Sequence, residues 1–299
     1  IPRIGGMVIY IFLILIALFS FESYLLNIIL ISAMPIIVIG AKEDLFHNTS
    51  PRLRLIFMIV SASLFIYLLP TNLPEIDFSL LNKVLSFSVM KEIFFIFSIL
   101  VIINGNNLID GVNGNMALTN IVQLCVLALL AFNVSDIFIT ELCLILLIPL
   151  MVFLIFNFPY GKIFSGDAGA YFYGFSISAC VIYLFGKYDQ LLSWNAILIL
   201  IYPSIELLFS FIRKKMFERK SPLTPDAKHL HSIIFRHLSK NLNLTNNSFV
   251  VIYLLPLIIA PFLVYLYSDD FFSIIFYILI IFVYFIMMYL YFLNLIYKK

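Results

Sequence analysis

The sequence predicts an all-helical protein that crosses a membrane many times. Of its 299 residues, 63% are hydrophobic and only 11% are charged. A water-soluble fold with so few charged residues could not cover its own surface. The apolar residues lie in stretches of roughly 20, the length at which a helix crosses a bilayer while satisfying its own backbone hydrogen bonds. We therefore expect about ten transmembrane helices in a single domain, residues 1–299.

The expected spans follow one another with short polar breaks between them. Only Phe21, Glu22 and Ser23 separate the first two, so one bent segment is the alternative there. We place the spans at residues 7–21, 24–40, 53–69, 92–103, 116–132, 137–156, 169–186, 194–212, 249–267 and 271–296.

Charge and cysteine usage exclude two classes of protein. Cys125, Cys143 and Cys180 all fall inside expected spans, where an isolated thiol behaves as a small hydrophobe, so no disulfide framework is expected. A net charge of +2 without a long basic run does not suit nucleic acid, and no nucleic-acid partner is expected. The expected partner is the lipid bilayer, and the sequence leaves a homodimer open.

The distribution of basic residues predicts the orientation. If residues 41–54 are cytoplasmic and the sides alternate, 15 of the 18 Lys and Arg residues lie in the cytoplasm, leaving Lys83, Lys91 and Lys187 outside. Such a bias is what the positive-inside rule requires, and it places both ends of the chain in the cytoplasm. The most polar segments then share that side, so we expect the site there: residues 41–54, 104–115, 157–169 and 213–247.

One polar segment repeats amide and acid side chains every three residues. Asn104, Asn107 and Asp110 are so spaced, and Asn113 continues the series, which would put several of these groups on one helical face. A polar run at a membrane boundary is costly unless it lines a wet cavity, although a solvated loop is the alternative. Three glycines are expected to interrupt the helix and to let a ligand approach the backbone: Gly105, Gly111 and Gly114.

Other acids are also candidates. Asp167 stands between Gly166 and Ala168 just before an expected span, a position that suits a Mg²⁺ ligand or, alternatively, a helix cap. Glu43 and Asp44 follow a span; adjacent side chains diverge on a helix, so only one is expected to share a site with Asp167, and a solvated helix end is the alternative. Glu206 lies inside an expected span and faces a cavity, a partner or the interface.

The longest polar segment carries donors that suit phosphate. Arg219, His229 and His231 lie there among other basic residues, and Pro222 and Pro225 prevent a continuous helix. A zinc site at the two histidines is disfavoured, because no Cys is near and a spacing of two does not place both rings on one helical face.

In order, these segments resemble the polyprenyl-phosphate N-acetylhexosamine-1-phosphate transferases, which begin lipid-linked glycan assembly at the bacterial inner (plasma) membrane. The resemblance spans nearly the whole chain. The matching motifs are Pro2-Arg3-Ile4-Gly5-Gly6, Gly40 with Glu43-Asp44, Asn104-x-x-Asn107-x-x-Asp110-Gly111, Asn157-x-Pro159 leading to Phe164-Ser165-Gly166-Asp167, and Ser221-Pro222 with Pro225-Asp226 and His229-x-His231.

The resemblance implies a UDP-activated amino sugar and undecaprenyl phosphate as substrates, Mg²⁺ as cofactor and UMP as product. It implies that Asp167 is the metal ligand, that Asp110 and Asn107 hold the nucleotide sugar, and that Asp44 is the acid near the lipid phosphate. Asp44, Asp110 and Asp167 are thus the expected catalytic residues. The expected substrate-binding residues are Asn104, Asn107, Asn113, Asn157, Lys162, Arg219, His229 and His231, the two histidines as pyrophosphate contacts.

The chain departs from the family pattern at four positions: Glu43, where an Asp is usual, Asn113, where a second Asp often follows, Glu206, where an Asp is usual, and Ser232, where a further His is frequent. The family commonly has one more span before its Pro-x-x-Gly-Gly turn, so a further span is expected before Ile1. The rival interpretation is a transporter or lipid-binding protein with Glu206 as the coupling acid. The sequence does not identify the sugar, whose recognition we expect in residues 213–247.

Overall fold

The computed structural model describes residues 2–19, 23–219, 221 and 226–297, and within these residues every regular element is a helix. The predicted all-helical class is therefore confirmed. In chain order the elements are α1 (Gly5–Phe19), α2 (Tyr24–Phe46), α3 (Pro51–Leu68), α4 (Ser79–Leu85), α5 (Ser88–Ile109), α6 (Asn115–Asn133), α7 (Ile137–Asn157), α8 (Gly166–Lys187), α9 (Ser193–Ile199), α10 (Ile201–Ile212), a π-helical turn η1 (Arg213–Phe217), α11 (Leu230–Leu242), a 3-10 turn η2 (Asn247–Phe249), α12 (Val250–Ile259), α13 (Phe262–Tyr267) and α14 (Phe271–Tyr297).

Each of the ten expected spans corresponds to helical structure, but not every one is a single helix long enough to cross a membrane. Among the described residues, eight helices are long and apolar enough to cross a membrane, and a ninth span results if the bent pair of α9 and α10 counts as one. The helix α1 is shorter, at 15 described residues. The chain is thus a polytopic membrane protein.

The bend between α9 and α10 has a local cause. The two helices meet at 74°, where a single span over residues 194–212 was expected. Pro203 has no N–H to donate to the carbonyl of Ile199, four residues earlier. That carbonyl instead accepts a hydrogen bond from Gln123 Nε2 of α6, at 3.0 Å. The side chain of a neighbouring span thus satisfies the backbone group that the break exposes.

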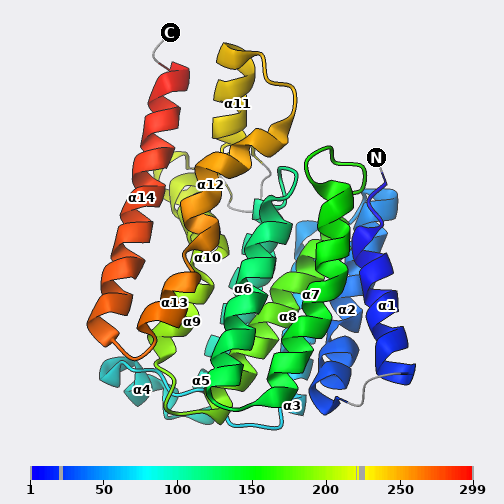
Figure 1. Ribbon diagram of the computed structural model, residues 1–299, viewed down its shortest axis with the longest axis vertical. Helices are drawn as coiled ribbons and strands as arrows, with labels where there is room; N and C mark the ends of the chain where they lie inside the picture. The colour runs from blue at the N-terminus through cyan, green and yellow to red at the C-terminus, as the bar shows by residue number, and fades with distance from the viewer. Residues whose placement is uncertain (1, 20–22, 220, 222–225, 298–299) are drawn as a thin grey trace.

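The first two spans form two separate helices, so the alternative of one bent segment is wrong. Ser23 caps α2 by accepting a hydrogen bond from the N–H of Leu26, at 3.2 Å. Helix α1 runs beside α2 in the opposite direction (Figure 1), and Tyr10 donates to the carbonyl of Leu30 at 2.7 Å. The start of α1 therefore lies at the same end of the bundle as the end of α2.

Helix α8 is the central helix of the bundle. Nearly all of its residues are buried, and α1, α2 and α5 pack against it. Small residues allow this close approach: a Cβ on Gly174 would lie 2.9 Å from the Cα of Ile103 in α5. Since Asp167 is in the first turn of α8, the core of the bundle fixes its backbone.

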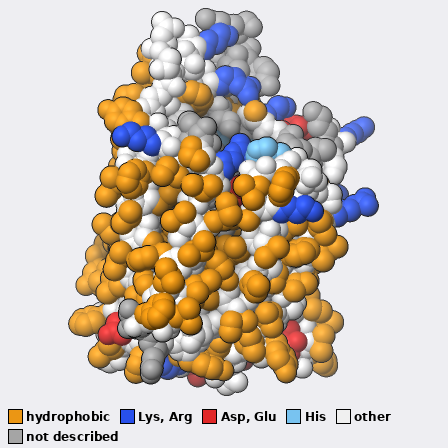
Figure 2. Space-filling model, turned by 90° about the vertical axis from the view of Figure 1, so that its right-hand side faces the viewer, with side chains coloured by type: hydrophobic (Ala, Val, Ile, Leu, Met, Phe, Trp, Pro, Cys, Tyr) orange, Lys and Arg blue, Asp and Glu red, His pale blue; other side chains and the backbone are white. Residues whose placement is uncertain are grey.

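The polar segments gather at one end of the molecule, the upper end in Figure 1. The loops that follow α2, α5 and α7 lie there, as do α11, the start of α1 and the end of α14; α4 lies at the other end. Figure 2 shows one face whose middle is covered by hydrophobic side chains, with most of the Lys and Arg side chains near the upper end. That these segments together form one site on the cytoplasmic side stays a prediction.

The expected loops are shorter than predicted, because the helices continue into them. Helix α2 extends to Phe46 and α3 begins at Pro51, while α5 extends to Ile109 and carries Asn104 and Asn107 within the helix. Residues 166–169 are the first turn of α8, and 213–247 contains η1, α11 and the start of η2.

The prediction that Gly105 interrupts the helix is wrong, because α5 runs through it. A Cβ at this position would lie 2.2 Å from the carbonyl oxygen of Pro203. Gly105 therefore serves the contact between α5 and α10 rather than a break in α5.

Candidate active site

The carboxylate of Asp167 is held by three side chains from three helices. Its Oδ2 accepts from Arg54 Nη1 of α3 at 2.9 Å and from the Tyr171 hydroxyl at 2.7 Å, one turn further along α8. Its Oδ1 accepts from Asn107 Nδ2 of α5 at 3.1 Å. About a fifth of the side chain stays exposed, 18%, so the carboxylate is within reach of a ligand.

Asp167 does not cap its own helix, which was the alternative interpretation of the Gly-Asp sequence. The N–H groups of Asp167 and Ala168 donate to the two carboxylate oxygens of Asp44, at 2.8 and 3.1 Å. Asp44 is buried near the end of α2, so the alternative of a solvated helix end is wrong for it. Glu43 points elsewhere and accepts from the N–H and the hydroxyl of Thr49, as the divergence of adjacent helical side chains requires.

Asp110 ends α5 and lies near the same helix start. It accepts a short hydrogen bond from the hydroxyl of Ser165, the N-cap residue of α8. Burial raises the pKa of Asp110 to about 7; the Ser165 hydrogen bond opposes this, while the negative charges of Asp167 and Asp44 reinforce it. The three carboxylates thus lie close enough around the start of α8 for their charges to interact.

The turn after Asp110 is fixed by amide side chains. Asn157 Oδ1 accepts from the N–H of Gly114 at 2.6 Å, and its Nδ2 donates to the carbonyl of Ile163 at 2.9 Å. Asn113 Nδ2 donates to the carbonyl of Pro159 at 3.1 Å. A carboxylate at 113 could not make that donation, which gives a physical reason for the departure from the family pattern. Both amides thus join the turn after α5 to the segment between α7 and α8.

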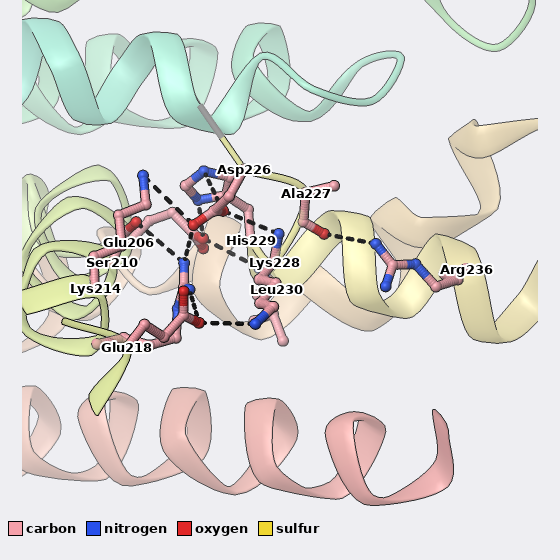
Figure 3. Close-up of polar contacts among 11 residues, drawn as sticks. Glu206, Ser210, Lys214, Glu218, Asp226, Ala227, Lys228, His229, Leu230 and Arg236 are labelled. Atoms are coloured by element: carbon pink, nitrogen blue, oxygen red, sulfur yellow. Dashed lines mark hydrogen bonds and ion pairs between the residues drawn. The ribbon is translucent and has the colours of Figure 1, made fainter. Parts of the chain in front are cut away.

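A second polar cluster joins α10 to the start of α11. Figure 3 shows Glu206, Asp226 and His229 turned toward one another. Glu206 Oε1 accepts from the N–H of Leu230 and lies 3.1 Å from His229 Nδ1, so the intramembrane acid faces a partner. Its Oε2 is buried and has no hydrogen-bond partner among the described residues.

Both histidines of the predicted pyrophosphate contact are buried. The rings of His229 and His231 stack with centroids 5.8 Å apart, because His229 precedes α11 in extended backbone while His231 is helical. The His231 ring packs on Gly111, where a Cβ would lie 2.0 Å from Nε2. The turn that begins at Asp110 therefore connects the two polar clusters.

A buried arginine ties the loop before α11 to η1. Arg213 Nη1 pairs with Glu218 at 2.7 Å, and its Nη2 pairs with Asp226 at 2.8 Å (Figure 3). Lys228 also pairs with Glu218, at 2.9 Å. Burial opposes ionisation of Asp226, but hydrogen bonds from Arg213 and Lys228 lower its pKa to about 2. Arg213 thus joins Glu218 to Asp226, and Lys228 also holds Glu218. Residues 222–225 lie outside the described residues.

The side chains of three predicted substrate-binding residues take no part in the contacts described above. Asn104 donates to the carbonyl of Leu100 at 2.8 Å and to the sulfur of Met58 at 3.4 Å, so it faces α3 rather than Asp167. Lys162 and Arg219 are exposed. No group of three His, Cys, Asp or Glu residues within the described part of the chain is arranged to hold a metal ion by itself.

Sequence reasoning missed Arg54, Tyr171 and Ser165 as members of the site. Arg54 carried a signal, because it is a basic residue where the polar segment 41–54 overlaps the expected span 53–69. Tyr171 follows Asp167 by four residues, the spacing at which helical side chains meet. Ser165 stands in the motif Phe164-Ser165-Gly166-Asp167 that the resemblance matched, but no role was assigned to it.

The fold and this cluster define a polytopic membrane protein whose acids gather at the end of its central helix. The family model described as Glycosyl transferase family 4 matches residues 26–185, more than half of the chain. The match includes Asp44, Asp110 and Asp167. The chain therefore belongs to glycosyl transferase family 4, as the resemblance to the polyprenyl-phosphate N-acetylhexosamine-1-phosphate transferases predicted.

Individual relatives of the chain are also named as transferases of this kind. The chain is 29% identical over 238 residues to a probable undecaprenyl-phosphate N-acetylglucosaminyl 1-phosphate transferase of Bacillus subtilis, covering 77% of this chain and 64% of the relative. It is 25% identical over 243 residues to an undecaprenyl-phosphate alpha-N-acetylglucosaminyl 1-phosphate transferase of Thermotoga maritima, covering 80% and 70%. A phospho-N-acetylmuramoyl-pentapeptide-transferase of Streptococcus thermophilus is 26% identical over 256 residues, covering 77% and 73%. The chain thus spans less than two thirds of the Bacillus subtilis relative's length.

Proposed function

We propose that this protein transfers an N-acetylhexosamine 1-phosphate from a UDP-sugar to undecaprenyl phosphate and releases UMP. The observation that carries the proposal is the Asp167 carboxylate, partly exposed beside Arg54 at the polar end of an apolar bundle. A soluble anionic donor and a lipid phosphate meet at such a boundary. The family and the relatives named for undecaprenyl phosphate support the acceptor.

The reaction balances without a further reactant. An oxygen of the lipid phosphate attacks the β-phosphorus of the UDP-sugar, and the bond from that phosphorus to the bridging oxygen breaks. The bridging oxygen leaves with UMP, and the sugar phosphate becomes part of a lipid pyrophosphate. Charge develops on phosphoryl oxygens, so positioning and positive charge supply the catalysis. Arg54 is the cationic side chain closest to Asp167 and is suited to a phosphoryl oxygen.

The donor set fits Mg²⁺. This ion takes one or two protein carboxylates and completes its shell with water and phosphate oxygens, and it does not need a cage of three protein ligands. Asp167 would hold it, with Asp110 close enough for its charge to be felt. When bound, the ion would neutralise the pyrophosphate and polarise the phosphoryl group.

The structure also shows how two other predicted substrate contacts, Asn107 and His229, are placed. Asn107 Nδ2 donates to Asp167 Oδ1 and so orients that carboxylate, and we propose that the amide oxygen of Asn107 accepts from the nucleotide sugar. His229 Nε2 lies 3.6 Å from Asp226 Oδ1, so a pyrophosphate oxygen that replaces this carboxylate would meet the ring. Glu206, the coupling acid of the transporter alternative, accepts from the N–H of Leu230 and lies beside the ring of His229.

The site faces the cytoplasm of a bacterial inner membrane. Support comes from the basic residues near the site and from α4 at the opposite end. Cysteine labelling in intact cells tests this orientation: a Cys at exposed Ser79 of α4 should react with an impermeant maleimide, and one at exposed Ser239 of α11 should not. The reverse pattern would place the site outside and refute a cytoplasmic donor.

The test of the function is UMP release. Purified protein in lipid is incubated with undecaprenyl phosphate, Mg²⁺ and each of a panel of UDP-linked N-acetylhexosamines. We expect UMP with at least one donor, only when the lipid phosphate is present, together with a lipid-linked sugar phosphate. Folded protein that releases no UMP with any donor would contradict the proposal, and so would UMP release that does not need the acceptor.

A further inference from the structure

We infer that Asp44 is a positioning residue: it caps α8 from a different helix and thereby fixes the backbone of Asp167, and it does not act on the substrates. The inference rests on the proposed function for the role of Asp167. It reassigns a residue that the family resemblance suggested as the acid near the lipid phosphate.

Both oxygens of Asp44 are engaged by the backbone of α8. Oδ1 accepts from the N–H of Asp167 at 2.8 Å, and Oδ2 accepts from the N–H of Ala168 at 3.1 Å. Only 8% of Asp44 is exposed. The first N–H groups of a helix have no partner within the helix, and a carboxylate there is also favoured by the helix dipole. The Asp44 carboxylate thus caps the N-terminus of α8.

The residue that would ordinarily supply the cap is used elsewhere. Ser165 is the N-cap residue of α8, yet its side chain makes no capping hydrogen bond. Its hydroxyl donates to Asp110 instead. Ser165 therefore bonds the side chain of Asp110. Asp44 from α2 replaces Ser165 as the cap of α8 and bonds the backbone of Asp167.

The backbones of α2 and α8 approach each other closely beside Asp44. Gly166 has a positive φ of 72°, and a Cβ there would lie 2.3 Å from Asp44 Oδ2. One turn before Asp44, a Cβ on Gly40 would lie 2.6 Å from the Cα of Ala168. Glycines at both places let the carboxylate reach the helix start. The spacing of four puts Gly40 and Asp44 on the same face of α2.

Amide hydrogen exchange tests the inference without any assay of transfer. In the full-length protein in lipid, Asp44→Ala should speed exchange at the amides of Asp167 and Ala168 on the order of tenfold, and Asp44→Asn should do so to a smaller extent. The matched control is Asp136→Asn: Asp136 caps α7 at the opposite end of the bundle by accepting from the N–H of Ile139 at 3.2 Å. That variant should change exchange at Ile139 and leave Asp167 unchanged.

A second readout separates positioning from action on substrate. If Asp44 positions Asp167, Asp44→Asn should weaken Mn²⁺ binding measured on the protein alone and raise the KM for Mg²⁺, with transfer largely restored at high Mg²⁺. If Asp44 acted on the substrates, transfer would be lost at every Mg²⁺ concentration while Mn²⁺ binding to the protein alone stayed unchanged.

The outcomes are distinguishable. Unchanged exchange at Asp167 and Ala168 in folded Asp44→Asn and Asp44→Ala overturns the inference, and so does a loss of transfer that Mg²⁺ does not restore. If the unaltered protein released no UMP, the proposed function would fail, while the exchange and Mn²⁺ results would still decide whether Asp44 holds the start of α8.

Discussion

Arg54 Nη1 lies 2.9 Å from Asp167 Oδ2, so the proposed metal ligand is already paired with a cation in the protein without substrate. The arginine comes from the first turn of α3, 113 residues earlier in the chain. In this position it occupies part of the carboxylate that a divalent ion would use. If Asp167 holds Mg²⁺ as proposed, Arg54 and the ion would compete for its carboxylate until a pyrophosphate offered the guanidinium another partner.

Replacing Arg54 should change metal binding and transfer in opposite directions. Arg54→Gln removes a positive charge beside Asp167, and we expect Mn²⁺ to bind the free protein roughly three- to tenfold more tightly, since the pair is partly exposed and screened. Transfer should fall by about tenfold or more, because a cation near the phosphoryl group is lost. Mn²⁺ binding is measured by electron paramagnetic resonance and transfer by UMP release.

The control for this variant lies on the same helix. Arg52 is exposed two residues earlier, and Arg52→Gln should leave both measurements close to those of the unaltered protein. Weaker Mn²⁺ binding in Arg54→Gln would refute the competition between Arg54 and the metal.

Gly6, in the first turn of α1, should support the site through the start of α8. Gly6 donates its N–H to the carbonyl of Ser165 at 2.9 Å, and a Cβ on Gly6 would lie 2.0 Å from the backbone nitrogen of Gly169. Gly6→Ala must push α1 away from α8, at a cost of about 1–3 kcal/mol of stability. We expect a lower melting temperature and a transfer rate reduced even for the folded fraction.

Gly186→Ala is the matched control at the other end of α8. A Cβ there would lie 2.1 Å from the carbonyl oxygen of Asn72, so a similar loss of stability is expected. The folded fraction of that variant should transfer at a normal rate. Equal specific rates for folded Gly6→Ala and Gly186→Ala would show that the turn does not support the site.

The docking of α11 should weaken in acid. Burial and the neighbouring His229 lower the pKa of His231 to about 4, although the carboxylate of Glu206 from α10 opposes the shift. The pKa in the unfolded chain is higher, so the folded state binds fewer protons between about pH 6.5 and 4. Stability should be constant above this range and fall through it as pH falls, by up to about 3 kcal/mol.

Melting temperatures of His231→Gln at several pH values measure this contribution. The variant should lose less stability between pH 7 and 4 than the unaltered protein does. His47→Asn, at an exposed position, should keep the original dependence. An identical pH dependence in His231→Gln and the unaltered protein would contradict the prediction.

Much of the fold could be predicted because its signals are local. Runs of apolar residues located all ten helical segments, and the positions of the polar segments predicted which loops share one end. The bend at Pro203 depends on tertiary structure, since the carbonyl of Ile199 is satisfied by Gln123 from another helix. The same holds for Gly105, whose effect on α5 is decided by the contact with Pro203.

The sequence indicated which acidic residues come together at the candidate site better than it indicated what each of them does. Asp44, Asp110 and Asp167 meet as the ordered motifs suggested. The sequence could not indicate that Asp44 caps α8 while Ser165 turns to Asp110, because each contact joins segments that are far apart in the chain. Asn157 and Asn113 were predicted as substrate contacts, and the structure uses their amides to hold loops.

The most direct test of the account is Asp167→Asn, assayed for UMP release across a Mg²⁺ titration in purified, folded protein. The substitution keeps the size of the side chain and removes the charge that would hold the metal. We predict loss of transfer at all Mg²⁺ concentrations, with unchanged exchange at the amides of residues 167 and 168, because Asp44 still caps α8. Normal transfer at ordinary Mg²⁺ would remove Asp167 from the reacting centre and contradict the account.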